Sequence, residues 1–124
     1  MIDFKNASYL KLRPVSNTDG EDILSEMLID GEDVFATFKT VRDMVVITNK
    51  RIVTINVQGM TGKKKDFTSL PYSKVQAFSI ETASVIDLDC ELCLWFSSLG
   101  MVRFEIAGSF DIRGFNRLLS EYIL

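Results

Sequence analysis

Short apolar segments separated by polar turn residues between residues 33 and 107 predict a chain built mainly from antiparallel strands. Seven segments rich in β-branched and aromatic residues are separated by turn residues, a pattern typical of a sandwich or barrel. The turn between the second and third segments contains Asn49, which is suited to the positive φ of a tight hairpin. The segments lie at about 33–40, 43–49, 51–58, 65–70, 74–83, 87–97 and 101–107.

The last two segments predict a hairpin in which two apolar sides must match. In 87–97 the even-numbered positions are apolar, whereas Trp95 lies on the more polar odd-numbered side. The apolar side of 101–107 is also even-numbered. A three-residue loop, Ser98-Leu99-Gly100, keeps the two apolar sides together and gives the left-handed position to Gly100. We therefore expect three cross-strand pairs: Phe96 with Val102, Leu94 with Phe104, and Leu92 with Ile106.

Amphipathic helices are predicted on both sides of the strands. Thr18-Asp19-Gly20-Glu21 has the pattern of a capping box, and helical spacing of apolar residues continues from it towards Gly31. We expect an N-terminal helix at about 19–30 and, after the N-cap residue Ser109, a C-terminal helix at about 110–123 that covers an open end of the strands. The stripe of the second helix consists of Phe115, Leu118, Leu119 and Tyr122.

The length of 124 residues allows one domain and leaves no room for a second. We interpret residues 1–17, which show no clear period, as an N-terminal arm, and residues 18–124 as a single domain. The net charge of −3 opposes nonspecific binding to nucleic acid. The N-terminus lacks a signal-peptide pattern, and no apolar run approaches the ~18 residues of a transmembrane helix. We therefore expect a cytoplasmic protein.

The residues that usually carry catalysis are missing or poorly arranged. The chain contains no His, which removes the commonest general base and the His-containing zinc sites. Cys90 and Cys93 have C-x-x-C spacing, but residues three apart in a strand point to opposite faces. Alternating acids, namely Glu81, Asp87, Asp89 and Glu91, are best explained as a solvent-facing strand. We predict no enzyme, no catalytic residues, no metal site and no cofactor.

Three segments occur in the order found in a known family. Val46-Ile47-Thr48-Asn49-Lys50-Arg51-Ile52-Val53, Gly62-Lys63-Lys64-Lys65-Asp66-Phe67 and Leu70-Pro71-Tyr72-Ser73-Lys74-Val75 resemble the bacterial pleckstrin-homology (PH) domains, in particular small stand-alone members formerly classed as a domain of unknown function. The resemblance covers about 34–124 and the leading helix. It implies a mainly β (α+β) fold: a PH-like seven-stranded antiparallel barrel or orthogonal sandwich, capped by the C-terminal helix, with an extra N-terminal helix. Phe115 takes the place of the tryptophan found in the terminal helix of eukaryotic PH domains.

Trp95 is the strongest candidate for a contact with a partner. The expected register places it on the polar side opposite Arg103 and near Met101. An indole at that position needs cover, either from the chain itself or from another subunit. The resemblance implies a scaffold that forms a homo-oligomer, as a closed ring, and we expect Trp95, Met101 and Arg103 at its interface.

The alternative function is a peripheral module that binds anionic lipid or a phosphorylated ligand. Lys63, Lys64 and Lys65 form the only concentrated positive charge, and Lys39 and Arg42 lie near the first hairpin turn. Adjacent ammonium groups can hold phosphate, although three charges fall short of the ~4–8 typical of lipid-binding clusters. A solvated hairpin loop explains the same lysines without any ligand.

Overall fold

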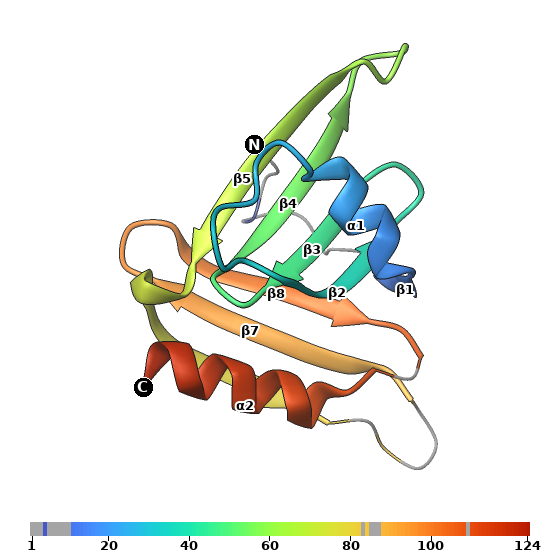
Figure 1. Ribbon diagram of the computed structural model, residues 1–124. Coiled ribbons are helices and arrows are strands. Elements are labelled where there is room, and N and C mark those ends of the chain that lie inside the picture. The colour runs from blue at the N-terminus through green and yellow to red at the C-terminus, as the bar shows by residue number, and fades with distance from the viewer. Residues whose placement is uncertain (1–3, 5–10, 83, 85–87, 109) are drawn as a thin grey trace.

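The protein, seen here in a computed structural model, is described for residue 4, residues 11–82, residue 84, residues 88–108 and residues 110–124. These residues form two antiparallel sheets and two α-helices (Figure 1). The first sheet has the order β1 (Arg13–Val15), β2 (Val34–Lys39), β3 (Met44–Thr48), β4 (Arg51–Gln58) and β5 (Lys64–Pro71). The second has the order β6 (Val75–Glu81), β7 (Cys90–Phe96) and β8 (Gly100–Ile106).

The expected fold class is confirmed, with a sandwich rather than a closed barrel. All seven predicted strands are present as β2 to β8. The turn η1 (Tyr72–Lys74) carries the chain from β5 into the other sheet. Within the described residues β5 pairs only with β4 and β6 only with β7, so the two sheets do not close on each other.

The short strand β1 was not predicted. It lies at the edge of the first sheet, where Pro14 is tolerated although it has no N–H to donate. Just before it, Leu12 donates from its N–H to the Glu105 carbonyl and accepts from the Ala107 N–H, and so joins the second sheet. Part of the segment that we interpreted as an arm therefore connects the two sheets. A domain boundary at residue 17 stays a prediction.

The predicted register of the β7–β8 hairpin is wrong by two positions. Gly100, at a φ of 86°, already pairs with Phe96, so the loop consists of residues 97–99. Gly100 is left-handed as expected. Because the shift is two residues, each side chain keeps its predicted face. The observed pairs are Phe96 with Gly100, Leu94 with Val102, Leu92 with Phe104, and Cys90 with Ile106.

Both predicted helices are present with different ends. The first, α1 (Asn17–Ile23), starts earlier because Ser16, not Thr18, is the N-cap and its hydroxyl accepts from the Thr18 N–H. It also ends earlier, and separate turns continue the chain towards Gly31. The second, α2 (Ile112–Ile123), is capped by Asp111, which accepts from the Gly114 N–H. Ser109, the predicted cap, lies outside the described residues.

The turn between β3 and β4 also differs from the prediction. In the described residues a positive φ occurs only at glycines, so Asn49 does not adopt the left-handed conformation. Its side chain instead accepts from the Asp33 N–H and donates to the Gly31 carbonyl. Asn49 therefore fixes the loop between α1 and β2 rather than the geometry of its own turn.

Two apolar clusters explain why β3 is buried along its whole length. The main core lies between the sheets and includes Phe115 and Leu119 of α2. A smaller cluster lies on the other face of the first sheet, where Leu24 packs with Val46 and Val53. Since both faces of β3 are covered, its sequence is a continuous apolar run rather than an alternating one.

A buried ion pair ties the loop after α1 to the β3–β4 hairpin. The Glu32 side chain is 0% exposed, and Arg51 donates to its two oxygens from Nε and Nη2, each at 2.9 Å. Thr48 Oγ1 and the Ile29 N–H also donate to Glu32. Burial alone would raise the pKa of Glu32, but the hydrogen bonds from Arg51, Thr48 and Ile29 hold it below its ordinary value.

Candidate functional site

The outer face of the β6–β7–β8 sheet carries the side chains that the sequence placed at an interface. Cross-strand register arranges this face in three rows. The first row is apolar, the second mixed and the third acidic. In order, the rows are Ala77, Trp95 and Met101; Ser79, Cys93 and Arg103; and Glu81, Glu91 and Glu105.

The apolar row exposes two large side chains to solvent. Trp95 is 38% exposed and Met101, directly opposite, is 45% exposed. The predicted position of Trp95 opposite Arg103 is wrong because of the register shift: Arg103 lies opposite Cys93. The structure still brings Trp95, Met101 and Arg103 onto one face. Only part of the indole is covered within the chain.

The acidic row places three carboxylates side by side across neighbouring strands. Like charges in such directly opposite positions repel one another. Arg103 Nη2 lies 2.8 Å from both Glu91 Oε2 and Glu105 Oε1, and Glu91, foremost, raises the pKa of the guanidinium. A hollow of about 220 Å³ adjoins the row and is also lined by Lys11, Asp89 and Cys90. One guanidinium is thus shared between two of the three acids.

The three predicted lysines lie on a hairpin that extends beyond the body of the sheet (Figure 1). We call residues 56–66 the β4–β5 arm. The last pair between β3 and β4 is Met44 with Ile55, so the arm has no β3 neighbour. Lys63, Lys64 and Lys65 are all exposed on it, and Met60 is fully exposed near its tip.

The turn between β2 and β3 holds the arm in place. Asp43 accepts from the Val57 N–H at 3.0 Å and from Asn56 Nδ2 at 3.3 Å. Arg42 donates from Nη2 to the Gly59 carbonyl. The structure therefore brings Arg42 to the arm that carries the lysines.

Lys39 belongs to a different part of this end. It pairs with Arg13 across β1 and β2, and both line a hollow beside the turn at Thr40 and Val41. Arg13 was not predicted as a site residue, since it lies in a segment whose apolar residues show no clear periodicity. Its position directly before Pro14, which favours an extended backbone, was the only local signal.

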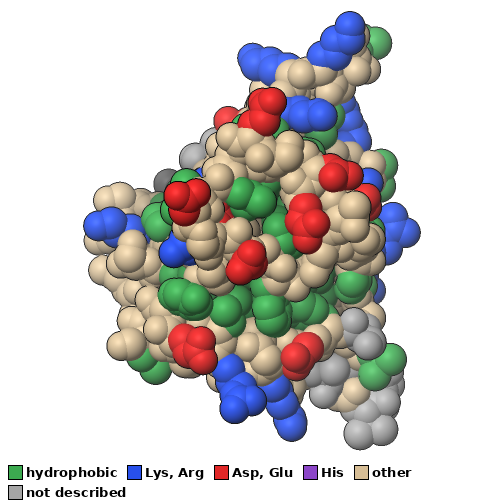
Figure 2. All heavy atoms as spheres, in the orientation of Figure 1, with side chains coloured by type: hydrophobic (Ala, Val, Ile, Leu, Met, Phe, Trp, Pro, Cys, Tyr) green, Lys and Arg blue, Asp and Glu red, His purple; other side chains and the backbone are tan. Residues whose placement is uncertain are grey.

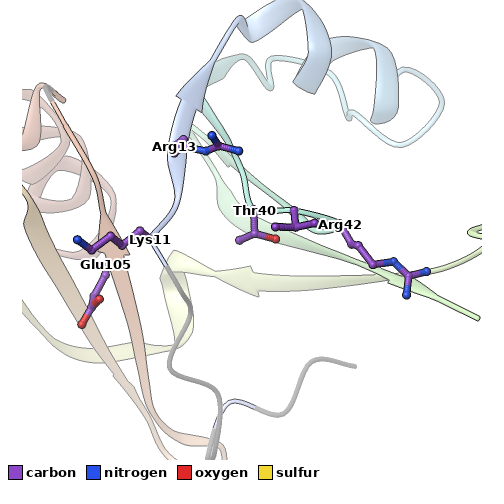
Figure 3. Close-up of a pocket in the computed structure, with 6 residues that line it drawn as sticks. Lys11, Arg13, Thr40, Arg42 and Glu105 are labelled. Atoms are coloured by element: carbon purple, nitrogen blue, oxygen red, sulfur yellow. The ribbon is translucent and has the colours of Figure 1, made fainter.

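A larger hollow of about 750 Å³ lies where the two sheets diverge. Figure 3 shows Arg13, Thr40 and Arg42 on one side of it and Lys11 and Glu105 on the other. The Lys11 ammonium lies 3.3 Å from Asp89 Oδ2, whose pKa is lowered by the Gly108 N–H and by Lys11. Val41, at the turn, is 95% exposed. This end of the fold thus combines cations with an exposed aliphatic side chain.

The two cysteines point to opposite faces, as predicted. Cys90 belongs to the main core, whereas Cys93 lies on the outer face and donates to Glu91. Burial raises the pKa of both thiols, so neither is a ready thiolate at neutral pH. Among the described residues, no group of three or more His, Cys, Asp or Glu residues is placed to hold a metal ion.

The predicted acidic strand is only partly what the sequence suggested. Glu81 and Glu91 lie on the solvent-facing side of the sheet, but Asp89 precedes β7 and is paired with Lys11. Asp87 lies outside the described residues.

In the part of the chain that the structure describes, no helix is long and apolar enough to cross a membrane.

Charge is distributed unevenly over the surface. Residues 19–33 contain seven acids and no Lys or Arg. Figure 2 shows Asp and Glu side chains spread across the face that carries α1, while Lys and Arg side chains gather at the far end of the β4–β5 arm. The face that carries α1 is therefore acidic, and the end of the β4–β5 arm is basic.

Comparisons with known proteins match nearly the whole chain. The sequence profile of the bacterial PH domain matches residues 3–123. The Bacillus subtilis protein YjqA is 46% identical over 92 residues, which cover 74% of this chain and 70% of YjqA. A crystal structure of a DUF1696 family protein with a pleckstrin-homology domain from Shewanella loihica superposes with a TM-score of 0.75 at 32% identity, covering 92% of this chain and 98% of that one. A pleckstrin homology domain from Shewanella amazonensis gives a TM-score of 0.61 at 36% identity, with 96% and 93% covered.

Proposed function

The chain belongs to the bacterial PH domain family, and from that premise we propose that it is a non-catalytic cytoplasmic binding and scaffold module that assembles with copies of itself. One observation carries the proposal: Trp95 and Met101 are neighbours on an exposed sheet face, at 38% and 45% exposure. Aromatic residues, Met and Arg are enriched at interfaces between proteins. The resemblance to small stand-alone family members adds that the assembly is a closed ring.

The mixed composition of the face fits an interface that forms and dissociates. Buried apolar area contributes about 25 cal/mol per Å², and an indole in the centre of an interface is a typical hot spot. Arg103 borders the apolar row and is already held by two carboxylates, so little side-chain entropy is lost when a partner covers it.

Size-exclusion chromatography with multi-angle light scattering tests the proposal. We expect the wild type to have the mass of an oligomer at micromolar concentration and Trp95→Ala to have a lower mass under the same conditions. Leu88→Ala is the matched control, because Leu88 is also a large exposed apolar residue but lies outside β7. A monomeric wild type, or equal loss of mass in both variants, contradicts the proposal.

A second candidate function is docking to an anionic surface through the basic end of the fold. The observation that favours it is the pairing of cations with exposed apolar residues: Arg42 contacts the arm, and Val41 and Met60 are almost fully exposed beside them. Cations with exposed apolar residues suit a membrane interface. We expect sedimentation with vesicles of phosphatidylserine and phosphatidylcholine, but not with phosphatidylcholine alone. Unchanged sedimentation after replacement of Lys63, Lys64 and Lys65 by Ser contradicts this function.

A further inference from the structure

We infer that the β4–β5 arm of one copy docks on the outer face of the β6–β7–β8 sheet of the next copy. The inference rests on the proposed self-association and adds which two surfaces meet. The occupant of the sheet face is thus a second copy of this chain, and the contact is between two different surfaces.

The arm has the geometry of a preformed docking element. An isolated two-stranded hairpin is marginally stable in water, yet Asp43 accepts from the Val57 N–H near the base of this arm and Arg42 donates to the Gly59 carbonyl further along it. A projection that is already ordered loses little conformational freedom when it binds. The arm can therefore reach a neighbouring molecule without a folding step.

The chemistry of the arm complements the outer face. Met60 is fully exposed near the tip, followed by three exposed lysines for which the structure records no ion pair among the described residues. The outer face offers an apolar row and, parallel to it, an acidic row. Trp95 and Glu91 are four residues apart along β7, roughly 13 Å at strand geometry. In the docked arrangement Met60 packs on the apolar row and the lysines pair with the acidic row, so both parts of the arm meet a complementary surface.

The acidic row is a better acceptor for the lysines than the acids around α1. The acids of residues 19–33 belong to a helix and several turns, and Figure 2 shows acidic side chains scattered over this face. In the row, three carboxylates are direct cross-strand neighbours, and Glu81 has no recorded cation partner among the described residues. An arriving ammonium group relieves that repulsion and fits the hollow of about 220 Å³ that adjoins the row.

Because the arm and the sheet face are different surfaces, each copy contacts one neighbour through its arm and another neighbour through its sheet face. Such a heterologous contact generates a closed ring or an extended chain, whereas a two-fold dimer would join a surface to itself. The ionic part of the contact weakens as salt rises.

Charge reversal with mixing tests the inference. The arm variant carries Lys63→Glu, Lys64→Glu and Lys65→Glu, and the face variant carries Glu81→Lys and Glu105→Lys, which leaves the Glu91–Arg103 pair in place. A matched control with Glu26→Lys and Asp30→Lys makes the same charge change as the face variant on the α1 side. Light scattering at low salt measures the mass of each protein and of an equimolar mixture of the arm and face variants.

We expect each reversed variant to dissociate at least tenfold more readily than the wild type, the mixture to recover the wild-type mass, and the control to behave as the wild type. Recovery in the mixture also shows that both variants are folded. Wild-type mass in both reversed variants, no recovery on mixing, or equal dissociation of the control overturns the inference. If only Trp95→Ala dissociates, self-association stands and the arm is not its partner surface; if the wild type is monomeric, both fail. A wild-type monomer whose lysine-dependent sedimentation with phosphatidylserine vesicles persists assigns the arm to a membrane instead.

Discussion

Truncation of Arg51 tests the energetics of the buried ion pair. In Arg51→Ala the Glu32 carboxylate, whose side chain is 0% exposed in the wild-type fold, loses two hydrogen bonds of 2.9 Å. Removal of one partner of a buried pair costs about 3–5 kcal/mol, because a buried charge is left without compensation. The Arg51 side chain is 22% exposed, so water can enter where the guanidinium was. We therefore expect a loss at the lower end, about 3 kcal/mol.

Urea unfolding followed by far-UV circular dichroism measures this loss. All proteins are compared at one concentration, since self-association would make stability concentration-dependent. For an m-value of roughly 1.5 kcal/mol per M, the midpoint falls by about 2 M. Lys50→Ala is the control, because Lys50 is exposed and adjacent, and it should shift stability by less than about 0.5 kcal/mol.

The pH dependence gives a second check on the same pair. The pKa of Glu32 is lowered in the folded protein, so ionised Glu32 contributes stability above its unfolded-state pKa. That contribution is lost as the pH falls through the folded-state pKa. The difference between the wild type and Arg51→Ala should therefore be largest at neutral pH and shrink below about pH 5. A loss of less than about 1 kcal/mol at pH 7, or a difference that grows on acidification, would contradict a stabilising role for the ion pair.

Three other substitutions have expected outcomes. Gly20→Ala should lower the free energy of unfolding by about 1–3 kcal/mol although Ala favours helices, because the new Cβ would collide with Thr37 Oγ1; urea unfolding at least as stable as wild type contradicts this. Tyr72→Phe should lower the free energy of unfolding by about 1–2 kcal/mol, since the Thr48 carbonyl loses a buried 2.6 Å hydrogen bond. Burial raises the pKa of Tyr72 well above the ordinary range, so the wild type and the variant should show the same number of tyrosines ionising near pH 10 in a spectrophotometric titration. Asp111→Ala should remove the cap of α2 and lower the thermal midpoint by an amount equivalent to about 1 kcal/mol, and Asp111→Asn should restore most of it.

The strands could be predicted from sequence because short segments rich in β-branched and aromatic residues are separated by turn residues. In β7 and β8 the alternation fixed which side faces inward, but it could not separate registers two residues apart. The choice depends on whether Gly100 ends the loop or begins the strand, and either option keeps Leu94 in the core. Trp95 was therefore placed on the correct face but opposite the wrong partner.

Other features depend on contacts distant in sequence. The strand β1 exists because Arg13 to Val15 pair with β2, and neither its length nor Pro14 favours a strand locally. The sequence does not distinguish Glu32 from the other acids of its segment, because its partner Arg51 is brought beside it only by the fold. The basic end likewise needed the fold, which brings Arg13 to Lys39 and Arg42 to the β4–β5 arm.

Burial of the Trp95 face between copies of the chain can be measured directly. Trp95 is the only tryptophan, so intrinsic fluorescence reports on this position alone. Acrylamide quenching of that fluorescence should be measured over a dilution series alongside the mass from light scattering. We expect quenching to increase as the oligomer dissociates on dilution. Quenching that stays constant while the mass changes, or a monomeric mass throughout the micromolar range, would contradict it.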